Sequence, residues 1–196
     1  IGKVGGPAVI GKASTASSLS GIFNMRVFFG IPTGLQRFIG KCMGTKDFAG
    51  LKRYFLSSIL FTTIVFSATS LSLFLFRNTI SEFIGLESIF ILLVAIHIFL
   101  SGVTSILRSF FISSMLTKEL FVFDVLGNIF RFLSGIYLVY SGWGASGAFM
   151  GFIISSFIIL LLRSIYVYNE LRKLEGSISI SWSSTRETTR VRSGTR

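Results

Sequence analysis

Long apolar runs alternate with short polar segments along the whole hydrophobic part of the chain. About 20 residues at 1.5 Å each cross roughly 30 Å of hydrocarbon, so runs of this length and low charge are typical of transmembrane helices. The pattern therefore predicts an all-α fold, a polytopic bundle of transmembrane helices. About five spans are expected, at residues 13–36, 54–76, 89–107, 121–140 and 147–162.

The composition supports a membrane protein. Of the 196 residues, 51% are hydrophobic and 14% are charged, and the mean hydropathy is +0.75. A soluble domain carries about 25% charged residues because its surface faces water. The net charge of +11 fits loops that meet anionic lipid headgroups. The lipid bilayer is therefore an expected partner, and nucleic acid is not.

Positive charge gives an orientation to the predicted helices. The segments 37–53, 108–120 and 163–175 carry ten Lys and Arg residues, whereas the segments on the opposite side carry three. By the positive-inside rule, the side with more Lys and Arg faces the cytoplasm. We expect a multi-pass protein of the cell membrane, with the loops 37–53 and 108–120 and the C-terminal tail in the cytoplasm.

The two ends of the chain differ from its hydrophobic part. The opening apolar stretch is too short and too Gly-broken for a signal peptide, so the chain is expected to begin inside a longer product. A transmembrane bundle over 1–175 is followed by 176–196, which is rich in Ser, Thr and Arg and is expected to be a disordered basic tail. A tail that rests on anionic lipid and a truncated or frame-shifted end are both open interpretations.

Polar side chains recur at helical spacing in three of the predicted spans. Charges within a bilayer are costly, and those that occur usually face the interior of a bundle or a watery cavity. Residues at i, i+4, i+7 and i+11 share one helix face. The three stripes are Arg26, Gly30, Thr33 and Arg37; His97, Ser101, Thr104 and Arg108; and Asp124, Asn128, Arg131 and Gly135. Three polar faces predict a common polar centre.

Several of these residues also have a simpler structural interpretation. Asp124 could neutralise a cation on a neighbouring helix, Arg108 could be an interface anchor, and His97 could be a packing histidine. Arg26 and Arg131 lie near the middle of their spans, where one acidic residue is available to both. A cationic cavity that favours an anionic ligand is the expected result.

The fifth predicted span has small residues at four-residue intervals. Gly147, Gly151 and Ser155 form a face that lets another helix approach closely. This pattern predicts helix packing and no chemistry.

The residues needed for catalysis are not found in the sequence. One histidine and one cysteine, Cys42, make neither a Cys–His nucleophile with an orienting partner nor a two-histidine metal site. The sequence also has no GxxxxGK[ST] loop, and the spans hold no paired carboxylates. We expect a protein that is not an enzyme and that uses no cofactor or metal.

Weak motifs follow one another in a recognisable order. In GIPTGLQRFIGKCMGTKDFAGLKRYF, Gly30-Ile31-Pro32 precedes Arg37-Phe38 and a small basic loop with Lys46-Asp47 in its turn. The opening GGPAVIGKASTASSLSGIF comes before this segment, and the turn Trp143–Ala148 comes after it. This order resembles polysaccharide flippases of the multidrug/oligosaccharidyl-lipid/polysaccharide exporter superfamily.

The resemblance covers about residues 5–174 and has several implications. It implies that the five spans correspond to helices two to six of a twelve-to-fourteen-helix transporter, with the first helix and the second lobe absent. It also implies that lipid-linked oligosaccharide or polysaccharide units are flipped by alternating access. The implied partners are the phosphate-bearing lipid-linked glycan and the missing lobe.

The residues expected to bind substrate combine the polar stripes with the resemblance. They are Arg26, Arg131, Asp124, Asn128, Arg37 and His97. Arg26 and Arg131 are expected to meet the carrier phosphate, and Arg37 matches the family position as a gate or an anchor. The alternatives are a cation-coupled multidrug exporter of the same superfamily and a non-transporting or truncated membrane protein.

Overall fold

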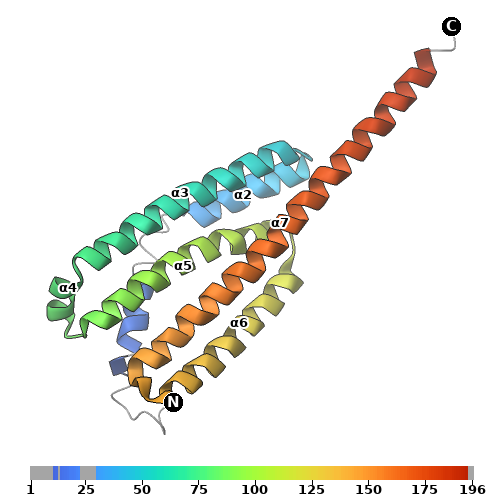
Figure 1. The fold of residues 1–196 in the computed structure, drawn as a ribbon. Helices are drawn as coiled ribbons and strands as arrows, with labels where there is room; N and C mark the ends of the chain where they lie inside the picture. The colour runs from blue at the N-terminus through green and yellow to red at the C-terminus, as the bar shows by residue number, and fades with distance from the viewer. Residues whose placement is uncertain (1–10, 13, 23–29, 194–196) are drawn as a thin grey trace.

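The computed structural model describes residues 11–12, 14–22 and 30–193, with side chains to Lys173. These residues are helical apart from short turns and contain no strand, which confirms the all-α class. Figure 1 shows long helices lying side by side. After a helical segment at 14–22, the elements are α2 (Ile31–Gly44), α3 (Phe48–Leu75), α4 (Arg77–Ile84), α5 (Ser88–Ser113), α6 (Thr117–Leu138), the π-helical η1 (Val139–Trp143) and α7 (Gly144–Ser193).

Within the described part of the chain, three helical stretches are long and apolar enough to cross a membrane: Phe48–Leu75, Ser88–Ser113 and Thr117–Lys173. The third contains α6 and the part of α7 as far as Lys173, and these two helices run in opposite directions along each other (Figure 1). Gly142 (φ 90°) and Gly144 (φ 53°) make the reversal, in a backbone region that glycine adopts without steric cost.

The N-terminal part differs from the predicted pattern at Gly30. This residue has φ 73° and directly precedes α2, so a single helix does not run through it over the predicted span 13–36. Pro32 lies in the first turn of α2, where its missing N–H removes no helical hydrogen bond. The glycine and the proline together explain why a new helix begins at Ile31.

The segment 37–53, expected as a basic loop, is largely helical. Only Thr45, Lys46 and Asp47 separate α2 from α3. A carboxylate oxygen of Asp47 accepts a hydrogen bond from the backbone N–H of Gly50 at 2.9 Å and caps α3. Because a capped helix can extend beyond the apolar run, the start of α3 before Tyr54, which includes Lys52 and Arg53, was not recognised as helical from hydropathy alone.

The central helix α5 packs against its neighbours through two apolar clusters. The first joins Leu35 and Ile39 of α2 to Phe110 and Phe111 of α5. The second contains Phe66, Phe90, Val94, Ile98 and Phe149. Between helices α3 and α5, a Cβ added to Gly102 would lie 2.4 Å from the ring of Phe66, so this glycine permits their close approach.

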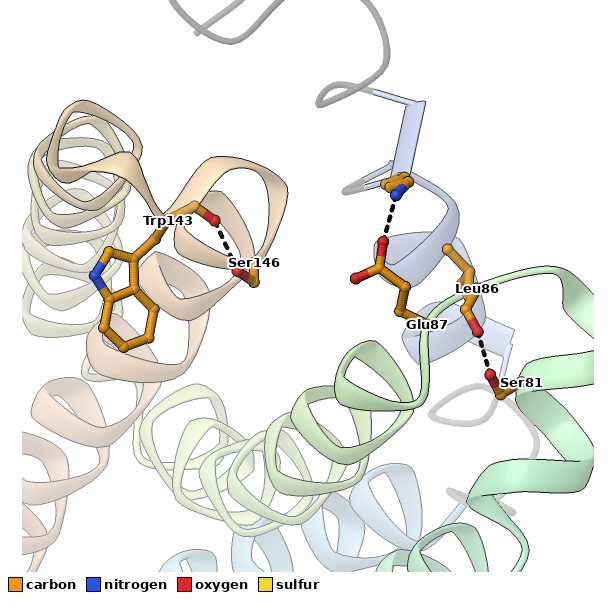
Figure 2. Close-up of polar contacts among 6 residues, drawn as sticks. Ser81, Leu86, Glu87, Trp143 and Ser146 are labelled. Atoms are coloured by element: carbon orange, nitrogen blue, oxygen red, sulfur yellow. Dashed lines mark hydrogen bonds and ion pairs between the residues drawn. The ribbon is translucent and has the colours of Figure 1, made fainter.

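Short polar contacts hold the end of the bundle that carries α4 (Figure 2). They link Lys12 Nζ to Glu87 Oε1 at 2.5 Å, the hydroxyl of Ser81 to the carbonyl of Leu86, and the hydroxyl of Ser146 to the carbonyl of Trp143 at 2.7 Å. The first contact links the N-terminal segment to the N-cap residue of α5, and the other two stabilise local turns.

The distal part of α7 projects beyond the other helices (Figure 1). Its backbone is helical as far as Ser193. The disordered basic tail expected over 176–196 stays a prediction.

Candidate functional site

A cavity of about 360 Å³ lies between α5, α6 and α7. Its lining residues are His97, Thr104 and Arg108 of α5; Phe123, Asp124, Gly127, Asn128 and Arg131 of α6; and Phe152, Ser155, Ser156, Ile159 and Arg163 of α7. Three arginines and one aspartate give this lining a formal charge of +2 with the histidine neutral. The cavity is therefore electrostatically suited to an anion.

Two of the three polar stripes meet in this cavity. The α5 stripe contributes His97 and Arg108, and the α6 stripe contributes Asp124, Asn128 and Arg131. The stripes converge because α5 and α6 are consecutive helices joined by a short turn after Ser113. At 1.5 Å per residue, the α6 stripe extends about 10 Å from Asp124 to Arg131.

Asp124 lies between two arginines from different helices. Its Oδ1 is 2.5 Å from Nη2 of Arg163 on α7, and its Oδ2 is 3.5 Å from Nη2 of Arg108 on α5. The Arg163 side chain is 3% exposed, whereas that of Arg108 is 53% exposed. A buried guanidinium needs a counter-ion, so the carboxylate offsets the cost of placing Arg163 inside the bundle.

Arg131 is held by neutral groups. Its Nη2 donates a hydrogen bond to Oδ1 of Asn128 at 2.6 Å, one turn earlier on α6. Its guanidinium carbon lies 4.8 Å from the ring centroid of Phe152 on α7, a cation–π distance. An arginine has five N–H donors in a planar fork, so these contacts leave donors available for a ligand.

His97 lies at an aromatic wall of the cavity. Its ring meets Phe149 and Phe152 edge-on, with centroid distances of 5.6 and 6.1 Å. Its Nδ1 is buried and has no hydrogen-bond partner among the described residues. This environment fits both a packing role and a ligand contact, so the role of His97 in binding stays a prediction.

Small residues bring α6 and α7 together and so form the cavity wall. A Cβ added to Gly151 would lie 2.7 Å from the backbone nitrogen of Gly135. One turn further along α7, the Ser155 hydroxyl donates to the carbonyl of Gly127 at 2.6 Å. The packing face predicted for the fifth span is thus confirmed, and α6 is the helix that packs on it.

The described residues of the third predicted stripe, Gly30, Thr33 and Arg37, do not line the cavity. Arg37 is exposed on α2 and lies outside the cavity. Arg26, the other arginine of that stripe, lies outside the described residues. The expected meeting of three stripes is therefore seen for two of them.

Sequence reasoning missed Arg163 because this residue follows the predicted fifth span and was counted as a loop charge. A signal was available: Gly147, Gly151, Ser155, Ile159 and Arg163 recur at four-residue intervals. Residues at this spacing lie along one helix face. If the small-residue face had been extended by two helical turns, Arg163 would have been predicted to face α6.

The described residues hold no group of three His, Cys, Asp or Glu side chains placed to bind a metal ion. The chemistry that the arrangement supports is anion binding by guanidinium groups. Arginine suits this task because its planar fork matches carboxylate and phosphate oxygens two at a time.

The chain matches the model of the protein family described as MatE over residues 1–136. No curated protein and no solved structure matches the chain. The family match agrees with the superfamily indicated by the sequence motifs, while a flippase subfamily stays a prediction. Its members are membrane transporters and not enzymes. The chain thus belongs to the MatE family, within the multidrug/oligosaccharidyl-lipid/polysaccharide exporter superfamily.

Proposed function

We propose that the cavity between α5, α6 and α7 binds the phosphate-bearing head of a lipid-linked oligosaccharide, and that the protein takes part in flipping such units across the membrane. The observation that supports this proposal is that Arg108, Arg131 and Arg163 line one cavity, whose described lining holds a single carboxylate, Asp124. An excess of guanidinium groups in a cavity raises the local concentration of anions.

The pairing of Asp124 makes a cationic ligand less suitable. A cationic drug would need a carboxylate that is free to neutralise it, and this carboxylate already contacts Arg163 and Arg108. By contrast, the contacts of Arg131 within the described part of the chain are with neutral groups, the amide of Asn128 and the ring of Phe152. The charge that is left for a ligand to neutralise is positive.

The surface beside the cavity suits a ligand with a lipid tail. On α6, Phe132 and Leu133 follow Arg131 and are 61% and 59% exposed. Large exposed apolar side chains on a membrane helix can face hydrocarbon without the cost that they would have in water. A phosphate head could occupy the cavity while its polyprenyl chain stays in the bilayer.

Glycan export in a flippase-deficient strain tests the proposal. We expect the full chain to restore export and Arg131→Gln to abolish it without changing membrane insertion. Arg77→Gln is the matched control because Arg77 lies on α4, outside the cavity lining. Failure of the full chain to restore export, or full export with Arg131→Gln, would contradict the proposal.

The drug-exporter alternative predicts a different outcome in the same cells. It requires efflux of cationic drugs that is lost on Asp124→Asn. The flippase proposal expects no such efflux from the unmodified chain. For Arg26, which lies outside the described residues, the sequence prediction of phosphate binding is tested by Arg26→Gln in the export assay.

A further inference from the structure

The two arginines beside Asp124 are held very unequally, and we propose that they have different tasks. Arg163 is a positioning residue that fixes the carboxylate, whereas Arg108 is a mobile arm that leaves the carboxylate to bind the ligand phosphate. This inference rests on the proposed function and deepens it in two ways. It identifies Arg108 as a second phosphate contact in addition to Arg131, and it gives the charge of the preferred ligand.

Arg163 forms the stronger of the two contacts. Its Nη2 lies 2.5 Å from Oδ1 of Asp124, a short charge-assisted hydrogen bond, and its side chain is 3% exposed. Moving such a group away from its counter-ion would leave a buried, unpaired charge. Arg163 therefore remains with Asp124 when a ligand binds.

Arg108 is much less constrained. The distance from its Nη2 to Oδ2 of Asp124 is 3.5 Å, beyond the usual range of N–H···O hydrogen bonds, and its side chain is 53% exposed. Exposed pairs of this kind contribute little stability. A phosphate offers the same two-oxygen geometry as a carboxylate, so Arg108 can exchange one for the other at low cost.

The exchange also gives the charge of the preferred ligand. With Asp124 and Arg163 left as a neutral pair, the remaining cations among the described lining residues are Arg108 and Arg131. A phosphate monoester carries a charge of about −1.5 to −2 at pH 7. Two guanidinium groups match this charge. In a lipid-linked glycan the phosphate is esterified at both ends, so a single phosphate carries one negative charge and a diphosphate carries two. The diphosphate is therefore the form that matches both arginines, and a monoester such as farnesyl phosphate approximates its charge.

Binding of farnesyl phosphate to the purified full chain in detergent tests the assignment. Farnesol is the uncharged control, and inorganic phosphate and phosphatidylglycerol test the other sources of phosphate. We expect Arg108→Gln to weaken farnesyl phosphate binding roughly tenfold, because a hydrogen bond to a charged group is lost, without changing the thermal unfolding midpoint. We expect Arg163→Gln to lower that midpoint.

A double variant keeps the test valid if Arg163→Gln does not fold. Asp124→Asn with Arg163→Met removes both members of the buried pair, and adding Arg108→Gln to it should still weaken binding roughly tenfold. No change of affinity on adding Arg108→Gln would overturn the assignment of Arg108.

The outcomes separate this inference from the proposed function. Wild-type affinity in Arg108→Gln, together with weakened binding in Arg131→Gln, would overturn the mobile-arm assignment and leave the proposed function intact. Wild-type affinity in both variants, or equal binding of farnesol and farnesyl phosphate, would overturn both. Equal competition by inorganic phosphate or phosphatidylglycerol would contradict a lipid-linked phosphate as the ligand.

Discussion

Oδ1 of Asp124 lies 2.5 Å from Nη2 of Arg163, and this ion pair joins α6 to α7 at one end of the cavity. The pair has two consequences. It allows an arginine with a 3% exposed side chain to sit inside an apolar bundle, and it occupies the carboxylate that could otherwise bind a cation. Stability and ligand preference are thus linked through one residue.

Breaking the Asp124–Arg163 pair is expected to destabilise the protein. Asp124→Asn leaves Arg163 buried without a counter-ion, and loss of one partner of a buried pair costs about 3–5 kcal/mol. Because Asp124 is 35% exposed, we expect a value near the lower end, about 3 kcal/mol. The measurement is the thermal unfolding midpoint in detergent.

The control for this prediction is an ion pair of similar length at the surface. Lys12 and Glu87 are 2.5 Å apart with side chains 46% and 61% exposed (Figure 2). Removing this pair by Glu87→Gln should cost less than about 1 kcal/mol. Equal losses in the two variants would show that burial does not determine the strength of the Asp124–Arg163 pair.

The α6–α7 contact is expected to tolerate no side chain at Gly151. In Gly151→Ala the new Cβ would lie 2.7 and 2.8 Å from backbone atoms of Gly135, so the helices must separate. Such overpacking costs about 1–3 kcal/mol, seen as a lower unfolding midpoint.

The same substitution at Gly40 is the matched control. Gly40 is exposed on α2, and a Cβ added there meets no atom within 4 Å. Gly40→Ala should stabilise the protein by about 0.5–1 kcal/mol through helix propensity. If Gly151→Ala left the unfolding midpoint as high as Gly40→Ala does, the close approach of α6 and α7 would be contradicted.

The aromatic face beneath Arg131 is expected to orient its guanidinium. Phe152→Leu keeps an apolar side chain and removes the cation–π contact, which is worth about 0.5–2 kcal/mol. We expect weaker binding of farnesyl phosphate, by about two- to thirty-fold, with little change in folding. Phe121→Leu, at a residue that is 68% exposed and outside the cavity lining, should bind like the unmodified chain.

The orientation expected from the distribution of basic residues can be tested with single cysteines. Cys42 is the one cysteine and is buried, so Cys42→Ser provides the background. Lys118→Cys and Glu82→Cys place exposed thiols at opposite ends of the long helices. In intact cells, an impermeant maleimide should label the Glu82→Cys variant and leave Lys118→Cys unlabelled; the reverse pattern would invert the topology.

Hydropathy and helical spacing predicted the parts of this protein that depend on local sequence. The apolar runs correspond to α3, α5, α6 and the first half of α7, and the spacing of Asp124, Asn128 and Arg131 places these residues on one cavity wall. Both features follow from helix geometry, which repeats along the chain irrespective of its neighbours.

Features that depend on backbone conformation or on neighbouring helices were missed. The positive φ of Gly30 divides the first predicted span, and hydropathy contains no signal for it. From the sequence, Arg163 was predicted to lie in a loop. In the structure, α7 runs antiparallel to α6 and brings Arg163 next to Asp124. Which residue of a neighbouring helix becomes the counter-ion depends on how the helices pack, and the spacing of residues along the sequence does not determine this packing.

The central claim is that the cavity selects an anion through its arginines. Calorimetric titration of the purified chain with farnesyl phosphate, compared with farnesol, tests this claim most directly. The account predicts binding of farnesyl phosphate that weakens with rising salt and is lost in Arg131→Gln, with no comparable binding of farnesol. Equal affinity for the charged and uncharged ligands, or unchanged binding in Arg131→Gln, would contradict it.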